Sequence, residues 1–259
     1  MRLERRDGVP LIVGHRGAAA VAPENTLAAF EAALEVGVDA IEFDVLDLPA
    51  GPLILAHSDD LHEVSHGAAT GLVRTSSLAE LRGVAPDLPT LDEALDWFAA
   101  REVTLHVDLK LTTRLDELVA AIESRGLAPR TVVSSFHVPS LLEIARLAPE
   151  IAIGRTYPED RYGVARRPAL RPVLRVGTTA LRRALALRVP AMLEQAGAGA
   201  LMLHHAVVSP AAVAKAHSRG AVVWTWTVDD PAEGRRVAAA GVDAVISNDP
   251  AALAATLRA

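Results

Sequence analysis

Short strand-like runs alternate with helix-like runs along nearly the whole chain of 259 residues, and this alternation limits the fold more than any other feature. The strand-like runs are apolar and rich in β-branched residues, and the segments after them carry apolar residues at helical spacing. Such alternation is typical of a parallel sheet with crossover helices. The predicted strands are residues 11–13, 40–45, 53–57, 103–110, 131–134, 151–156, 200–203, 221–227 and 244–247.

The segments between these runs predict the helices. Asn25 or Thr26 is the expected N-cap of the first helix, which Gly37 closes, and Pro139 fits the first turn of a later one. Residues 59–74 are polar and contain glycines, so we expect a loop there, and the Arg- and Pro-rich residues 157–178 are expected to be irregular. The other helices are expected from residue 77, over 91–100 and 115–125, up to 193, and over 210–219, 231–240 and 250–258.

Eight principal βα units result if residues 53–57 belong to an insertion that follows the second strand. This pattern predicts an α/β fold, a (β/α)₈ TIM barrel with a small insertion after the second strand. A chain of this length that is 51% hydrophobic can bury one large core. Because no linker with a shift in composition divides it, we expect residues 1–259 to form a single domain.

Charged side chains stand at the ends of the first predicted strands. His15 and Arg16 follow the first strand, Glu42 and Asp44 share one face of the second, and His57 ends the next apolar run. These are carboxyl ends of strands, where α/β barrels build their sites. Two adjacent carboxylates on a buried strand need a compensating cation or base. The pattern therefore predicts a metal site.

A third carboxylate comes from the strand over residues 103–110. His106, Asp108 and Lys110 share its inward face, with Lys110 nearest the mouth of the barrel. An Asp–Lys pair that supports the barrel is one interpretation. Beside the other charged residues, we interpret Asp108 as a third metal ligand and Lys110 as a cation facing a phosphate. Three carboxylates without cysteine indicate one divalent cation that prefers oxygen, Mg²⁺ or Ca²⁺.

An ordered set of motifs carries a resemblance over nearly the whole chain. HRG, PENT, GVDAIEFDV and LILAHSD are followed by VDLK, VVSSF, VWTWTVDD and GVDAVISNDP. Together they resemble the glycerophosphodiester phosphodiesterase family. The resemblance implies metal-dependent hydrolysis of glycerophosphodiesters to sn-glycerol 3-phosphate and an alcohol such as choline or ethanolamine. It assigns His15 and His57 as the general acid–base pair, and it implies attack by a neighbouring glycerol hydroxyl through a cyclic phosphate.

Substrate-binding residues are expected around this pair. Arg16 offers a planar fork and Lys110 a point charge to the phosphate, and Trp226 matches the family's Trp-Thr-Val-Asn motif and is expected against the glycerol or head group. Phe136 is expected either at the same mouth or in the core. Glu24 and Asn25 are expected to fix the loop behind His15. The remaining histidines outside the strands are expected in loops or at the surface: His62, His66, His137, His204, His205 and His217.

Three residues depart from the family pattern. Ser58 stands where the family often has Asp after the histidine, and we expect it to remove a partner that orients His57. Asp108 stands where Glu is common, and Asp229 replaces the Asn of the tryptophan motif. Two alternatives to the main hypothesis therefore stay open. One is phospholipase D-like action on lysophospholipids, and the other is a catalytically silent barrel that binds phosphodiesters.

Composition limits the partners. A net charge of -6 argues against nucleic-acid binding, and the absence of cysteine excludes disulfides and thiolate chemistry. The basic start of the chain has no apolar segment after it, and no later stretch is long and apolar enough to span a bilayer. We expect a cytoplasmic enzyme without stable membrane insertion that acts on a small-molecule glycerophosphodiester. The sequence does not predict the oligomeric state.

Overall fold

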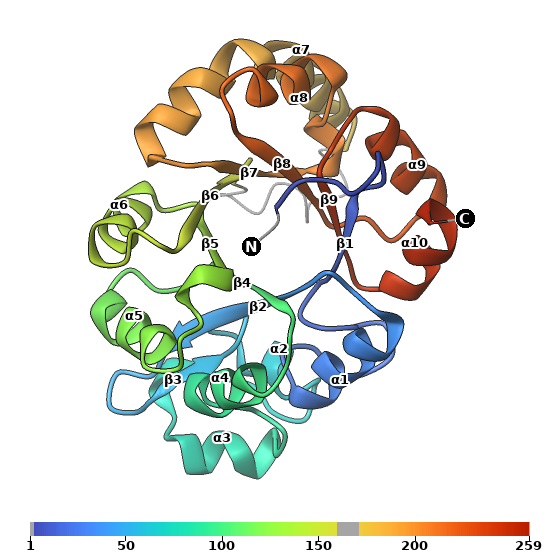
Figure 1. The fold of residues 1–259 in the computed structure, drawn as a ribbon. Helices are drawn as coiled ribbons and strands as arrows, with labels where there is room; N and C mark the ends of the chain where they lie inside the picture. The colour runs from blue at the N-terminus through green and yellow to red at the C-terminus, as the bar shows by residue number, and fades with distance from the viewer. Residues whose placement is uncertain (1–2, 160–170, 259) are drawn as a thin grey trace.

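Eight parallel strands close into a barrel, as Figure 1 shows end-on. The structure is a computed structural model that describes residues 3–159 and 171–258, with the backbone alone for residues 171–176. Val13 of the first strand pairs with Ala40 of the second, and Leu11 pairs with Ala244 of the last, so the eight strands of the barrel form a closed ring. The barrel strands are β1 (Leu11–Gly14), β2 (Ala40–Asp47), β4 (Thr104–Leu109), β5 (Thr131–Ser135), β6 (Ala152–Tyr157), β7 (Ala200–His204), β8 (Val222–Trp226) and β9 (Ala244–Ser247).

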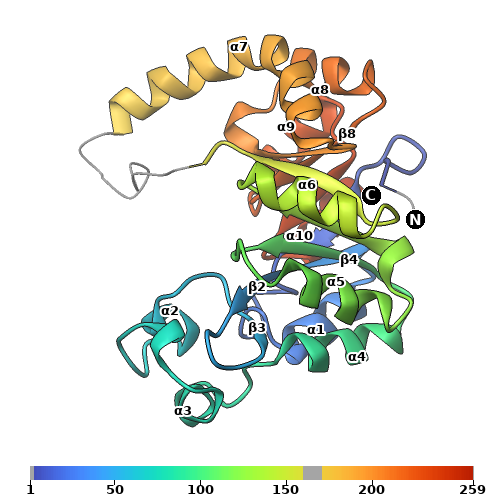
Figure 2. The same ribbon diagram turned by 90° about the vertical axis from the view of Figure 1, so that its left-hand side faces the viewer.

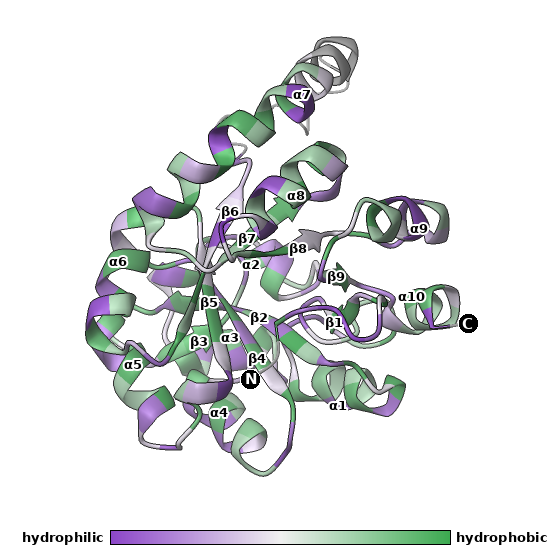
Figure 3. Cartoon of the chain, turned by 45° about the horizontal axis from the view of Figure 1, so that its top comes forward, coloured by the Kyte–Doolittle hydropathy of each residue, from purple (hydrophilic) through white to green (hydrophobic). Residues whose placement is uncertain are grey.

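A ring of helices surrounds the strands (Figure 1). In Figure 3 the helices carry both hydrophobic and hydrophilic bands, as expected where one face packs on the sheet and the other meets water. The side chain of Thr26 caps the first helix by accepting from the Ala29 N–H, so Thr26 and not Asn25 is the N-cap. The barrel helices are α1 (Leu27–Val36), α4 (Leu91–Ala99), α5 (Leu115–Glu123), α6 (Val138–Leu147), α7 (Arg171–Ala196), α8 (Pro210–His217), α9 (Pro231–Ala239) and α10 (Pro250–Leu257).

An insertion lies between β2 and α4. Its strand β3 (Leu53–Leu55) pairs antiparallel with β2, with Val45 opposite Leu55, and α2 (Leu61–Val64) and α3 (Leu78–Val84) follow. Figure 2 shows these elements protruding from one end of the barrel, away from the two chain termini. Leu46 and Leu48 of the barrel side pack with Ile54, Leu81 and Leu88 in a separate hydrophobic cluster. The insertion thus has a small core of its own.

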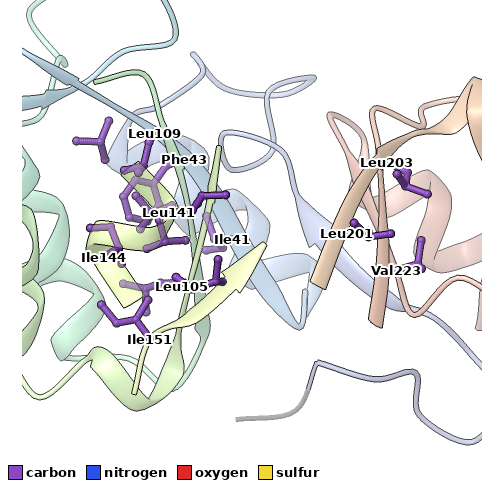
Figure 4. Close-up of a cluster of buried hydrophobic side chains, with 14 of the residues drawn as sticks. Ile41, Phe43, Leu105, Leu109, Leu141, Ile144, Ile151, Leu201, Leu203 and Val223 are labelled. Carbon is purple, nitrogen blue, oxygen red and sulfur yellow. The ribbon is translucent and has the colours of Figure 1, made fainter. Parts of the chain in front are cut away.

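Two shells of apolar side chains build the barrel. Between sheet and helices, outward-facing residues such as Phe43 and Leu105 pack with Leu141 and Ile144 of α6, as Figure 4 shows. Inside the barrel, Trp224 is fully buried and its Nε1 donates to the Leu3 carbonyl at 2.9 Å. Apolar side chains and the start of the chain therefore fill the N-terminal end of the barrel, and the polar residues gather at the other end.

The predicted fold is confirmed, with differences at several boundaries. The predicted strand 53–57 is shorter, and the predicted loop 59–74 contains α2 and the beginning of a short 3₁₀ turn, Val73–Thr75. Helix α7 begins at Arg171, so the prediction of irregular structure over 157–178 is wrong for residues 171–178, while residues 160–170 lie outside the described part. Among the described residues, none of the helices is long and apolar enough to cross a membrane.

Candidate active site

Three carboxylates meet at the C-terminal end of the barrel. Parallel register sets Asp44 of β2 beside Asp108 of β4, and the strand period puts Glu42 on the same inward face. One oxygen from each lies within 4.8 Å of the others. Glu42 and Asp44 are buried, and the Asp108 side chain is 13% exposed. The cluster could hold a metal ion, and all its donors are oxygens, which suits a hard divalent cation.

The loop after β1 wraps tightly around this cluster. Arg16 has a left-handed backbone (φ 51°), and its N–H donates to Glu42 Oε2 at 2.8 Å. Gly17 follows with φ 89°, and a Cβ there would lie 2.6 Å from the Ala29 carbonyl oxygen, so only glycine fits. The His-Arg-Gly motif is therefore a backbone requirement as well as a set of side chains.

Two cations compensate Asp44. Lys110 Nζ lies 3.0 Å from Asp44 Oδ1, and Arg16 Nε lies 3.0 Å from Oδ2. Although burial alone would raise it, Lys110 and Arg16 hold the pKa of Asp44 well below its usual range. Lys110 also pairs with Asp108. The Asn25 amide donates to Asp44 Oδ2 at 2.9 Å, so Asn25 supports a carboxylate and does not cap a helix.

Glu42 is compensated less than Asp44, by the charge and the backbone N–H of Arg16. Burial raises the pKa of Glu42 well above its usual value, and the negative charges of Asp44 and Asp108 raise it further. A cation held by the three carboxylates would offset this crowding of like charges. The donor set thus fits the divalent cation that the sequence predicts.

His15 belongs to the barrel wall. Its Nδ1 lies 2.7 Å from Asn248 Oδ1, and the Asn248 amide in turn donates to Asp229 Oδ2 at 2.8 Å. Its Nε2 points toward the carboxylates, 3.9 Å from Glu42 Oε2. Burial, reinforced by Arg16, lowers the pKa of His15 to about 4. The ring is therefore neutral near pH 7. Asp229, which replaces the Asn of the family's tryptophan motif, fixes the Asn248 amide that holds the His15 ring.

His57 lies on the insertion and has a carboxylate partner. Its Nδ1 is 2.6 Å from Glu63 Oε1 on α2, and Arg16 Nη1 lies 3.5 Å from the same oxygen. Ser58 donates to Glu63 Oε2 at 2.6 Å. Ser58 was expected to remove a partner that orients His57, yet His57 has such a partner in Glu63. Sequence reasoning missed Glu63 because it lies in a predicted loop, where only the N-cap residue Asp60 signalled a helix.

Aromatic rings form another part of the mouth. The Trp226 ring lies 6.1 Å from Phe136 and 5.1 Å from His204, in both cases edge to face, and its Nε1 donates to the Met202 carbonyl. Phe136 thus lies at the mouth. His204 was expected in a loop or at the surface, but it ends β7 and is half-buried, and burial lowers its pKa to about 4.

Two further polar residues support Asp108. Ser134 of β5 donates to Asp108 Oδ1 at 2.7 Å and lies 2.9 Å from His106 Nε2. Ser134 belongs to the VVSSF motif, yet its contact with Asp108 follows only from the β4–β5 register.

A cavity of about 90 Å³ opens beside the site, lined in part by His57, Glu63 and apolar side chains of the insertion.

Comparison with known proteins gives consistent results. The model for the glycerophosphoryl diester phosphodiesterase family matches residues 15–252. A glycerophosphodiester phosphodiesterase from Caldanaerobacter subterraneus subsp. tengcongensis is 27% identical, with 94% of this chain and 96% of that protein covered. The structure of a putative glycerophosphoryl diester phosphodiesterase from Silicibacter pomeroyi is 28% identical, covers 99% of this chain and 95% of its own, and superposes with a TM-score of 0.78. A phosphodiesterase from Oleispira antarctica, solved in complex with the product sn-glycerol-3-phosphate, shares the fold with a TM-score of 0.73 at 24% identity, over 97% of this chain and 98% of its own.

Proposed function

The chain belongs to the glycerophosphoryl diester phosphodiesterase family, and we propose that it hydrolyses glycerophosphodiesters to sn-glycerol 3-phosphate and an alcohol with one divalent cation, Mg²⁺ or Ca²⁺. One observation carries the proposal. Three carboxylates, two cations and the His15 ring converge at the C-terminal end of one barrel. The product bound to the Oleispira antarctica phosphodiesterase supports the same class of small-molecule substrate.

Glu42, Asp44 and Asp108 would hold the cation. When bound, it would neutralise charge on a non-bridging phosphate oxygen. Lys110 and Arg16 flank the same carboxylates, and a phosphodiester bound there would meet both positive side chains. Arg16 suits a phosphate because its planar fork can donate two parallel hydrogen bonds, and Lys110 adds a point charge.

The two histidines would divide the proton transfers. His15 is neutral near pH 7 and directs Nε2 toward the carboxylates, so it is suited to take the proton of the attacking glycerol hydroxyl. His57 is suited to protonate the leaving alkoxide, because the Glu63 carboxylate offsets the charge of an imidazolium. The bond from phosphorus to the alcohol breaks as the new P–O bond forms. Water would then open the cyclic phosphate with the two roles exchanged.

Trp226 would contact the glycerol or the head group. It ends β8 at the mouth, half-buried, with Phe136 and His204 packed against its ring. An aromatic wall of this kind binds apolar and cationic groups alike. Both choline and ethanolamine therefore remain suitable head groups.

Lysophospholipids are a second candidate substrate. Leu72 of the insertion and Val21 of the loop after β1 are large apolar side chains that are 53% and 72% exposed. Both residues lie in segments that follow the carboxyl ends of barrel strands, where an exposed apolar side chain could contact an acyl chain. The assay described next separates this function from hydrolysis of glycerophosphodiesters.

The direct test measures product release from glycerophosphocholine and lysophosphatidylcholine in parallel. Each substrate is incubated with Mg²⁺, with Ca²⁺ and with EDTA, and both glycerol 3-phosphate and choline are followed. We expect metal-dependent glycerol 3-phosphate release from glycerophosphocholine and none in EDTA. Choline release from the lysolipid alone would move the function to the second candidate. Absence of turnover across a panel of head groups would indicate the silent barrel.

A further inference from the structure

We infer that Glu63 is a positioning residue for His57, and that helix α2 of the insertion serves to place the Glu63 carboxylate against it. The inference rests on the proposed function, since it concerns the histidine that protonates the leaving alcohol. It also explains how the chain dispenses with the aspartate that often follows this histidine in the family.

The contact between His57 and Glu63 is short, and Glu63 Oε1 lies closer to His57 than to Arg16. Glu63 Oε1 lies 2.6 Å from His57 Nδ1, whereas the nearest Arg16 nitrogen is 3.5 Å from the same oxygen. An ionised carboxylate has no proton to donate, so Nδ1 must carry the hydrogen of this bond. The bond therefore selects the ring form in which Nε2 is free to exchange protons with substrate. Arg16 also lies 3.0 Å from Asp44, so the pair is joined to the carboxylate cluster.

The second oxygen of Glu63 is held separately. Ser58 Oγ donates to Oε2 at 2.6 Å and itself accepts from the Asp60 N–H at 3.2 Å. The carboxylate thus binds two adjacent residues, His57 and Ser58, through different oxygens. A side chain fixed at both oxygens keeps one plane, which restricts rotation of the histidine ring. Ser58, the departure from the family pattern, has become part of the support.

The local fold is consistent with a carboxylate required at this position. Helix α2 has only four residues, all half-buried or exposed, so packing alone does not stabilise it. Asp60 caps it by accepting from the His62 N–H at 2.9 Å. The His57 hydrogen bond lowers the pKa of Glu63 to about 2, so Glu63 stays ionised over the pH range in which a histidine titrates. The short helix α2 thus places the Glu63 carboxylate against His57, six positions earlier in the chain.

The test compares Glu63→Gln with the native chain on two substrates. One is glycerophosphocholine, whose alcohol needs a proton to leave. The other is the p-nitrophenyl ester of glycerol 3-phosphate, whose nitrophenolate leaves without one. We expect Glu63→Gln to lower kcat on glycerophosphocholine by about 10- to 100-fold, a part of what a general acid contributes, with KM nearly unchanged. On the nitrophenyl ester, followed as nitrophenolate release in a single turnover so that ring opening does not contribute, we expect a loss of less than about threefold.

Matched variants separate positioning from damage to the helix. Asp60→Asn keeps an equally good N-cap on α2 and should leave both activities unchanged. Ser58→Ala removes the second hold on the carboxylate, so its loss on glycerophosphocholine should lie between those of the native chain and Glu63→Gln. Glu63→Asp should recover part of the activity, because it restores the charge at a shorter reach.

A second measurement does not depend on turnover. Nitrogen-15 NMR of labelled histidine, assigned with His57→Gln, should report a proton on Nδ1 of His57 at neutral pH and its redistribution in Glu63→Leu, whose side chain cannot accept a hydrogen bond. Unchanged kcat in Glu63→Gln, equal losses on both substrates, or an unchanged His57 signal would each overturn the inference. If the native chain turned over no glycerophosphodiester, the proposed function would fail, and the NMR result alone would decide the role of Glu63.

Discussion

The two histidines of the site belong to regions of different construction. His15 directly follows barrel strand β1, its side chain is 16% exposed, and its hydrogen-bond partner is the neutral amide of Asn248. His57 follows the short strand of the insertion, its side chain is 29% exposed, and its partner is the carboxylate of Glu63. The barrel wall therefore holds its histidine by packing and parallel register, and the insertion holds its histidine by polar contacts. One site thus combines a rigid half, built on the barrel strands, with a half that polar side chains assemble.

Substitution of a barrel carboxylate tests the rigid half of the site, and its effect on activity should be the largest. Asp44→Asn leaves Lys110 and Arg16 less compensated and removes a proposed metal ligand, so activity should fall below detection. Stability should fall by about 3 kcal/mol, as measured by denaturant unfolding. Asp243→Asn is the matched control. It changes a buried carboxylate at the opposite end of the barrel, where Asp243 accepts from the Val223 N–H, and should lower stability while sparing kcat. Equal loss of kcat in both variants would contradict the distinction between the two ends.

Substitutions in the core of the insertion test the half of the site that carries His57. Leu81 is fully buried in the cluster of the insertion, and Leu105 is fully buried between the sheet and the helices. Each change to Ala should cost about 2–5 kcal/mol. Hydrogen exchange should show Leu81→Ala opening residues 53–84 locally, with activity lost before the barrel unfolds. Leu105→Ala should instead lower protection throughout. Uniform opening in both variants would mean that the insertion and the barrel unfold as one unit.

The pH dependence of the Glu63 contact is the smallest expected effect. The pKa of Glu63 lies at about 2 in the folded chain, below its ordinary value of 4.5, because of the His57 hydrogen bond. A lowered carboxylate pKa stabilises the fold above pH 4.5, and that contribution is lost as the pH falls through about 2. After correction for the intrinsic exchange rate, hydrogen-exchange protection of residues 53–84 should therefore fall more in the native chain than in Glu63→Gln between pH 5 and pH 2.5, roughly the window between these two pKa values. Parallel curves for the two proteins would contradict this coupling.

The barrel half of the site could be predicted from the sequence better than the insertion half. Alternating patterns located the barrel strands within a few residues, and the period of two placed Glu42, Asp44, Asp108 and Lys110 on inward faces. These features depend on local geometry that repeats along a strand. Glu63 was missed because its role depends on a four-residue helix that has no periodicity to detect. The position of His204 beside Trp226 also depends on the register of two strands, which no local pattern encodes.

The most direct test of this account compares His15→Ala and His57→Ala on the two substrates with different leaving groups. Both variants should lose about 10²- to 10⁴-fold in kcat on glycerophosphocholine. On the p-nitrophenyl ester of glycerol 3-phosphate, followed as nitrophenolate release in a single turnover, His57→Ala should recover to within about tenfold of the native rate, because the nitrophenolate needs no proton and the later ring opening does not contribute. His15→Ala should keep a loss of about 10²- to 10⁴-fold there, since the attacking hydroxyl still needs a base. Recovery of His15→Ala instead, or equal behaviour of the two variants, would contradict the division of roles between barrel and insertion.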